Sequence, residues 1–282
     1  MKRRFHQVDV FTAAPLRGNP LAVVHAAQGL DDAHMAAFAR WTNLSETTFL
    51  LPPQDAGADY RVRIFTPGGE LPFAGHPTLG SCWAWLAGGG MPKVAGTVVQ
   101  ECGVGLVRVR VQTSQQGARL AFAAPPLRRT GPLGTELLQR IVAAIGVDPA
   151  DVLHHQWVDN GPGWCALMLR SAAAVLAVRV DGGLLGDVKL GLVGAHPAGS
   201  DCAFELRALY PMPGGLAEDP VTGSLNASVA QWLIAAGLAP ARYVAAQGTL
   251  LQRAGRVHIE QDGDTVWVGG DVTPVIDGEV DL

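Results

Sequence analysis

Two short segments carry the polar side chains that are best placed to do chemistry. They are Gly75–Ser81, which reads GHPTLGS, and Glu218–Ser224, which reads EDPVTGS. Laid over each other without a gap, they pair His76 with Asp219 and end on the same Gly-Ser step. A histidine and an aspartate that face one small molecule can act as acid and base, or can hold its polar groups. A His-Pro or Asp-Pro step is also common structural punctuation in turns, and both interpretations stand at this point.

The Gly-Ser steps at Gly80-Ser81 and Gly223-Ser224 are expected to open two helices. Free N–H groups in the first turn of a helix and the helix dipole favour an anion, such as a carboxylate or a phosphate. Plain N-capping by the serine is the alternative, and it needs no ligand. Two copies in equivalent places favour the ligand, and they predict one site built between two similar domains.

The surroundings of the two segments also match, which indicates an internal repeat. Each segment follows a strand-like run, and each precedes an apolar run that contains a tryptophan. The strand-like runs are Ile64–Pro67 and Leu209–Pro211, and the apolar runs are Cys82–Gly88 and Leu225–Gly237. The copies lie about half a chain apart, as two structural repeats would.

Glu46 lies where a predicted helix has just ended and a strand begins. Asp31 or Asp32 can cap a helix that runs to about Trp41, and Thr47–Leu51 is typical of a strand. Such a junction places the side chain at the rim of a sheet. An exposed acid on a loop is the alternative interpretation.

The elements expected around these residues are mostly strands. In each half several strands precede the motif, one helix follows it, and further strands complete the half. Long alternation of parallel strands and helices is absent, which argues against a Rossmann sheet. The proline-rich segment from Pro125 to Pro132 is the best domain boundary, and a helix over Thr135–Ile145 follows it. We therefore expect domains at 1–124 and 125–282, with the last strand a candidate to pack on the first domain.

The composition is typical of a globular protein of the cytoplasm. Of the 282 residues 48% are hydrophobic and 16% charged, which is too apolar for a disordered chain. A net charge of −4 gives no reason to expect nucleic acid or a membrane as a partner, so a small-molecule substrate is expected. Four scattered cysteines are typical of free thiols in a reducing compartment. No apolar run is long enough for a signal peptide core or a membrane span.

Motifs for metals, nucleotides and serine nucleophiles are missing from the sequence. There is no Walker A loop, no H-E-x-x-H and no G-x-S-x-G elbow. His154 and His155 have no third ligand in view, and Gly103–Gly105 does not open a helix. We therefore expect no metal ion and no nucleotide-binding loop.

Four ordered segments resemble the PhzF-like phenazine-biosynthesis protein family. They are Asn43–Phe49 (NLSETTF), Arg63–Pro67 (RIFTP), Glu70–Thr78 (ELPFAGHPT) and Glu218–Ser224. The resemblance covers nearly the whole chain, because further segments fit the same family: Asp9–Thr12, Gly18–Pro20, Gln247–Gly248 and Gly269–Gly270.

The resemblance implies an α+β protein with a diaminopimelate-epimerase-like fold. In that fold two similar domains, related by a pseudo-two-fold axis, each wrap a curved and mostly antiparallel sheet or barrel around a central helix. The active site lies in the cleft between the domains. The best-understood family member is an isomerase that works without a metal or an organic cofactor, and members are commonly homodimers.

The resemblance also implies roles for individual residues. The catalytic acid/base of the family corresponds to Glu46. His76 and Asp219 complete the catalytic set, because they would position polar groups of the substrate or relay protons. The substrate-binding residues are Gly75, Gly223, Ser224 and Ser45, the first three of them at the substrate carboxylate.

We therefore expect a cofactor-independent isomerase that moves a proton on a small cyclic carboxylate, similar to a phenazine precursor. Two alternatives stay open: an amino- or imino-acid racemase or epimerase of the same fold, and a non-catalytic metabolite-binding protein. Racemases of this fold place a thiol in each half at these turns, where this chain has His76 and Asp219. The pair Leu225-Asn226 replaces the small residues that the family usually has after Thr-Gly-Ser.

Overall fold

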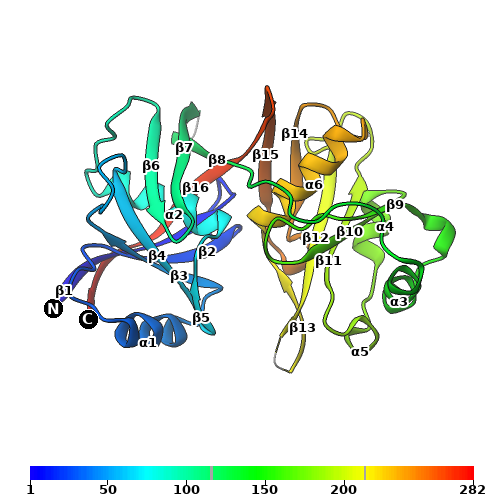
Figure 1. Cartoon of the computed structure of the whole chain (residues 1–282), viewed down its shortest axis with the longest axis horizontal. Helices are drawn as coiled ribbons and strands as arrows, with labels where there is room; N and C mark the ends of the chain where they lie inside the picture. The colour runs from blue at the N-terminus through cyan, green and yellow to red at the C-terminus, as the bar shows by residue number, and fades with distance from the viewer. Residues whose placement is uncertain (115–116, 213) are drawn as a thin grey trace. The chain divides into compact units, whose positions relative to one another are not determined.

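The computed structural model describes residues 1–114, 117–212 and 214–282 (Figure 1). The chain divides into two compact units. The first unit comprises Met1–Ala123 and Gly269–Leu282, and the second unit comprises Ala124–Val268. The last strand, β16 (Thr265–Asp281), therefore begins in the second unit and ends in the first.

The first unit is a closed barrel of eight strands. The strands follow the order β1-β2-β3-β4-β6-β7-β8-β16, and β16 pairs with β1 to close the barrel. Most neighbours are antiparallel, while β3 runs parallel to β2 and β6 runs parallel to β4. The strand bounds are β1 Lys2–Val10, β2 Asn19–Val24, β3 Glu46–Leu51, β4 Tyr60–Thr66, β6 Thr97–Cys102, β7 Gly105–Ser114 and β8 Gly117–Ala123, with the short β5 Gly69–Leu71 paired to β4.

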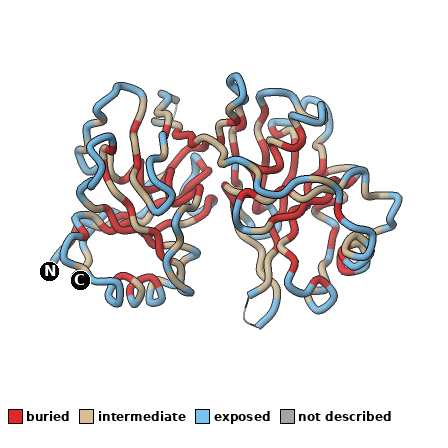
Figure 2. Tube along the Cα trace, viewed as in Figure 1, coloured by how far each residue is buried: buried red, intermediate tan, exposed pale blue. Residues whose placement is uncertain are grey.

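Helix α2 (Gly75–Ala87) fills the barrel. It contacts β1, β2, β3, β4, β6, β7 and β8, and most of its residues are buried. Gly80 lets the helix approach the barrel wall, because a Cβ atom at this position would lie only 2.5 Å from Leu21 Cδ2. Figure 2 shows the buried residues along the strands and the central helix.

The second unit is a sheet that packs on helix α6 (Gly223–Ala235). The strand order is β16-β15-β14-β12-β11-β10-β9, and β13 pairs with β12. Leu225 of α6 lies so close to β11 that a Cβ atom on Gly191 would be 2.6 Å from Leu225 Cδ1. The strand bounds are β9 Val152–Trp157, β10 Trp164–Leu169, β11 Lys189–Ala195, β12 Phe204–Met212, β13 Gly215–Asp219, β14 Arg242–Gln247 and β15 Gly255–Asp262.

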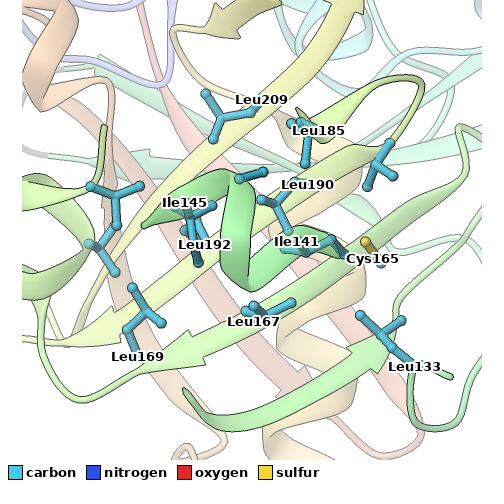
Figure 3. Packing of buried hydrophobic residues seen from close by; sticks show 14 residues of the cluster. Leu133, Ile141, Ile145, Cys165, Leu167, Leu169, Leu185, Leu190, Leu192 and Leu209 are labelled. Carbon is cyan, nitrogen blue, oxygen red and sulfur yellow. The ribbon is translucent and has the colours of Figure 1, made fainter. Parts of the chain in front are cut away.

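The same sheet carries a second hydrophobic core against three smaller helices. These helices are α3 (Thr135–Ile145), α4 (Ala172–Ala177) and α5 (Gly182–Leu185), and single turns of 3-10 helix lie at Pro149–Asp151 and Thr249–Leu251. Ile141 and Ile145 pack with Leu167, Leu190 and Leu192 of the sheet (Figure 3). Every residue of β10 is buried as a result.

Two helices expected from the sequence are confirmed. Helix α1 (Asp32–Thr42) has Asp31 as its N-cap, and the Asp31 carboxylate accepts a hydrogen bond from the backbone N–H of His34. Helix α3 covers the expected residues and ends at Gly146, which takes the left-handed conformation with φ of 65°.

The two units repeat one topology, which confirms the internal repeat. Each begins with an antiparallel hairpin, β1–β2 or β9–β10, and a helical crossover then leads to a parallel strand, β3 or β11. An antiparallel strand follows, β4 or β12, with a short hairpin partner, β5 or β13. The central helix, α2 or α6, then crosses to β6 or β14, which runs parallel to β4 or β12.

The expected start of α2 and the residue pairing across the repeat were wrong. Helix α6 begins at Gly223 as expected, whereas α2 begins at Gly75, so Gly80-Ser81 lies inside the helix. A proline in the first turn does not delay a helix, because the N–H groups of that turn have no acceptor within it.

The helix starts therefore match Gly75 with Gly223 and His76 with Ser224. The register of the strands identifies the residue of the first unit that is equivalent to Asp219. This residue pairs with Ala208 on β12, at the position where Leu71 pairs with β4 in the first unit. His76 and Asp219 thus do not occupy the same repeat position.

Candidate active site

Glu46 and His76 come together in the first unit. Glu46 is the first residue of β3, and its side chain is 15% exposed. His76 is the second residue of α2, and its side chain is 6% exposed. Glu46 Oε2 and His76 Nε2 lie 3.4 Å apart. Helix α1 ends at Asn43 in the left-handed conformation, and this sharp end lets β3 begin only three residues later, beside the start of α2.

The imidazole of His76 is neutral near neutral pH. Burial lowers the pKa of His76 to about 3, and a hydrogen bond to the carbonyl of Pro20 opposes this shift without cancelling it. Asn19 Nδ2 lies 3.4 Å from His76 Nδ1, on the side of the ring away from Glu46. With so low a pKa the imidazole does not take up a proton near neutral pH, so beside the Glu46 carboxyl group it serves as an uncharged hydrogen-bonding partner.

Two expected binding residues flank this pair. Gly75 is the first residue of α2 and is buried. Ser45 precedes Glu46 and is exposed at the surface of the unit. The N-cap of α2 is Ala74, which has no side-chain oxygen with which to cap the helix. The first-turn N–H groups of α2 therefore receive no side-chain hydrogen bond from their N-cap.

In the second unit Asp219 and Ser224 lie at the start of α6. Asp219 ends β13, and its Oδ2 accepts a hydrogen bond of 2.6 Å from the Thr222 hydroxyl. Thr222 is the N-cap of α6, but because its hydroxyl points to Asp219 it does not cap the helix. Gly223 and Ser224 are the first two helical residues. Ser224 is therefore not the N-cap, which removes the N-capping interpretation of the Gly-Ser step.

The loop between β9 and β10 holds Ser224 in place. Trp164 Nε1 donates a hydrogen bond of 3.0 Å to Ser224 Oγ. Asn160 Nδ2 donates one of 2.9 Å to the backbone carbonyl of Ser224. Asp159 shapes the loop, because its Oδ1 accepts from the backbone N–H groups of Gly161 and Gly163, both at 2.7 Å.

Gln247, at the end of β14, fixes the turn that leads from Asp219 into α6. Its Oε1 accepts hydrogen bonds from the Thr222 backbone N–H (3.0 Å) and from Asn226 Nδ2 (2.7 Å). Its Nε2 donates to the Asp219 carbonyl (3.1 Å) and to Thr222 Oγ1 (2.9 Å). The side chain is fully buried, so these four bonds satisfy the whole amide without water.

An arginine–glutamate pair supports the approach to the central helix in both units. Arg63 on β4 binds Glu70 on β5 through two hydrogen bonds, of 2.7 and 2.6 Å. Arg207 on β12 binds Glu218 on β13 in the same bidentate way, at 3.1 and 2.8 Å. The pairs occupy equivalent places in the sheet register, and the second is the more buried.

Sequence reasoning did not place Asn19, Asn160, Trp164 or Gln247 in the site. The segments Gly18–Pro20 and Gln247–Gly248 belong to the family resemblance, and this could have drawn attention to Asn19 and Gln247. Asn160 and Trp164 carry no local signal, because their role arises from contacts with residues about 60 positions away along the chain.

Burial keeps the Cys82 and Cys165 thiols protonated near neutral pH. All four cysteines are free, and burial raises the pKa of the Cys165 thiol to about 12 and that of the Cys82 thiol further still. Among the described residues, no group of three or more His, Cys, Asp or Glu side chains is arranged to hold a metal ion. No helix among residues 1–114, 117–212 and 214–282 is long and apolar enough to cross a membrane.

Comparison with known proteins gives a consistent picture over almost the whole chain. The family model "Phenazine biosynthesis-like protein" matches residues 8–278. Antisense-enhancing sequence 1 of Schizosaccharomyces pombe is 32% identical over 98% of this chain and 97% of its own length. The trans-2,3-dihydro-3-hydroxyanthranilate isomerase of Pseudomonas chlororaphis is 33% identical over 77% of this chain and 74% of its own. The structure of a predicted epimerase of Pseudomonas aeruginosa is 30% identical, with a TM-score of 0.80 over 99% of both chains.

We predict that Gln247→Leu strongly destabilises the protein. The substitution removes four hydrogen bonds and leaves the buried Thr222 backbone N–H without its acceptor, which should lower the free energy of unfolding by about 3–5 kcal/mol. Urea denaturation measures the change. Gln261→Leu, at an exposed glutamine, is the control and should change stability by about 0.5 kcal/mol or less. A loss below about 1 kcal/mol for Gln247→Leu would show that the turn is held by other contacts.

We also predict that removing the arginine of the buried Arg207–Glu218 pair destabilises the protein. Arg207→Met leaves Glu218 charged and largely buried, and we expect a loss of about 3–5 kcal/mol in the free energy of unfolding. Arg242→Met breaks the exposed pair with Glu260 and should cost about 0–1 kcal/mol. Equal losses in the two variants, measured by urea denaturation, would contradict the structural importance of the buried pair.

The lowered pKa of His76 makes stability depend on pH. The unfolded chain protonates this histidine below about pH 6.5, while the folded protein keeps it neutral down to about pH 3. Its contribution to stability is therefore full above pH 6.5 and is lost as the pH falls towards 3. We expect the wild type to lose more stability than His76→Gln between pH 7 and pH 4.5, as measured by urea denaturation. Equal losses of stability in the wild type and in His76→Gln would show that His76 is charged in the folded protein.

Proposed function

The chain belongs to the phenazine biosynthesis-like protein family, and from this premise we propose that it is a cofactor-independent isomerase. It moves a proton on a small cyclic metabolite that bears a carboxylate, similar to a phenazine precursor. The observation that carries the proposal is the buried Glu46–His76 pair, with 3.4 Å between Oε2 and Nε2. Isomerase names among the relatives support the same reaction class.

In the proposed reaction Glu46 is the proton carrier. Its carboxylate removes a proton from a carbon that the ring makes acidic, and the C–H electron pair enters the conjugated system. The proton then returns to another carbon on the same face, so atoms and charge balance and the product is an isomer. The neutral imidazole of His76 has a single N–H, which donates to the Pro20 carbonyl, so its Nε2 faces Glu46 as an acceptor for the proton of the protonated carboxyl group.

The second unit is proposed to hold the substrate. Gly223 and Ser224 present the first turn of α6, where backbone N–H groups and the helix dipole favour a carboxylate. Asp219 is proposed to hold a polar group of the substrate. In the first unit, Gly75 and Ser45 flank the acid/base pair and complete the binding set. The proposal includes a homodimer, which the family resemblance implies, and the cytoplasm, which the composition of the sequence favours.

We predict that Glu46→Gln abolishes proton exchange. The wild type and the variant would be incubated in D2O with trans-2,3-dihydro-3-hydroxyanthranilate and with a panel of amino acids, and deuterium uptake followed by NMR. The wild type should incorporate deuterium at a shifted ring carbon, and Glu46→Gln should be slower by about 10²–10⁴-fold, because it cannot carry the proton. Glu136→Gln, at an exposed position on α3, is the control and should match the wild type.

Other outcomes point to the alternatives. Exchange at an α-carbon without a shifted double bond would favour a racemase or epimerase. Binding of ligands without any exchange would favour a metabolite-binding protein. Exchange that persists in Glu46→Gln would remove Glu46 as the base.

A further inference from the structure

The orientation of the Gln247 amide is fixed by two backbone groups of the turn before α6. Its Oε1 faces the backbone N–H of Thr222 at 3.0 Å, and its Nε2 faces the backbone carbonyl of Asp219 at 3.1 Å. A backbone N–H can only donate and a carbonyl can only accept, so a flipped amide would lose both bonds. The side-chain nitrogen of Gln247 is therefore also the donor in its contact with Thr222 Oγ1, which measures 2.9 Å.

Hydrogen counting then gives the Thr222 hydroxyl a single direction. Its oxygen accepts from Gln247, and its only proton is donated to Asp219 Oδ2. The three side chains form a chain of hydrogen bonds that runs from Gln247 through Thr222 and ends on the Asp219 carboxylate. Gln247 is fully buried and Thr222 is 7% exposed, so water has little access with which to replace either bond.

The length of the last bond in this chain is typical of an ionised acceptor. Thr222 Oγ1 and Asp219 Oδ2 lie 2.6 Å apart, within the range of about 2.5–2.7 Å for a hydroxyl that donates to a carboxylate. Six other threonine hydroxyls in the described part of the chain donate to backbone carbonyls, over 2.8–3.4 Å. Thr249, which donates to the carboxylate of Glu205, does so over 2.7 Å. The Thr222 contact is thus of the charge-assisted kind.

The two carboxyl groups of the proposed site therefore have different surroundings. Glu46 lies beside a neutral imidazole, whose Nε2 is an acceptor for its proton. Asp219 instead receives a donated proton, which stabilises its charged form and opposes protonation. Two carboxyl groups whose surroundings favour different protonation states can divide the work of a reaction, one as proton carrier and one as a fixed charge.

We propose that Thr222, oriented by Gln247, is a positioning residue that keeps Asp219 ionised and fixes its rotamer. Asp219 then acts as a charged hydrogen-bond acceptor and not as a second proton carrier, and proton transfer falls to Glu46 alone. The inference rests on the proposed function, which places Asp219 in the site, but its test needs neither a substrate nor turnover.

The test follows the protonation of Asp219 in the ligand-free full chain by carboxyl 13C NMR, between about pH 3 and pH 8. Asp219→Asn identifies the signal, and the wild-type carboxylate should stay ionised down to about pH 5. Thr222→Val keeps the shape of the side chain but removes the hydroxyl, and should raise the midpoint of the Asp219 titration by about one pH unit. Thr222→Ser keeps the hydroxyl and should restore the wild-type midpoint. Thr135→Val, at an exposed threonine of α3, is the control and should leave the midpoint unchanged.

The other ionisable side chains around the turn stay the same in these variants, so a change of midpoint reports the missing hydroxyl. They are Glu218 and Arg207, which bind each other, Glu205, which pairs with Thr249 and His196, and Arg253 of the loop from Gly248, which packs on Pro220.

Several outcomes would overturn the proposal. Equal midpoints in the wild type and in Thr222→Val would show that the threonine only supports the turn. A wild-type Asp219 that gains its proton near neutral pH would contradict the ionised state, and this result needs no variant to fold. A shift that persists in Thr222→Ser, or that appears in Thr135→Val, would not come from the hydroxyl. None of these results would touch the proton transfer assigned to Glu46, because deuterium exchange tests that step separately.

Discussion

The burial of one apolar helix inside each sheet is the constraint on which the other features depend. Most residues of α2 and α6 are buried, and most of the buried ones are small or apolar. Glycines at the contact points, Gly80 and Gly191, let helix and strand approach to distances that any side chain would forbid. His76 and Ser224, which are proposed site residues, are the second residues of these two helices.

Neither α2 nor α6 has a side-chain cap at its N-terminus, and contacts from the surrounding hairpins hold each N-terminus instead. Ala74 offers no cap, and the Thr222 hydroxyl is committed to Asp219. The arginine–glutamate pairs fix the approach to each helix, and Gln247 fixes the turn itself. Rigid support of helix starts that their own N-cap side chains leave uncapped is the arrangement expected of a preorganised site.

Local sequence patterns were sufficient to predict the elements whose ends are marked by capping residues. The Asp31 cap, the Gly146 end of α3 and the Gly223 start of α6 were all expected from the sequence. The start of α2 was missed because Pro77 was taken as part of a turn. The last strand was expected as a candidate to pack on the first domain, but its pairing with β1 and the contacts of Asn19 and Trp164 join residues far apart along the chain, and no local period encodes such pairings.

The corrected repeat pairing bears on the reaction itself. A racemase that works from two faces needs a base at matched places in both halves. Here the matched residues are His76 and Ser224, and the N-caps before them are Ala74 and Thr222. At these matched places the first unit has a neutral imidazole beside the Glu46 carboxyl group, while the second has a serine hydroxyl. One proton carrier can remove and return a proton on a single face, and this asymmetry favours an isomerase that shifts a double bond over an enzyme that inverts a centre.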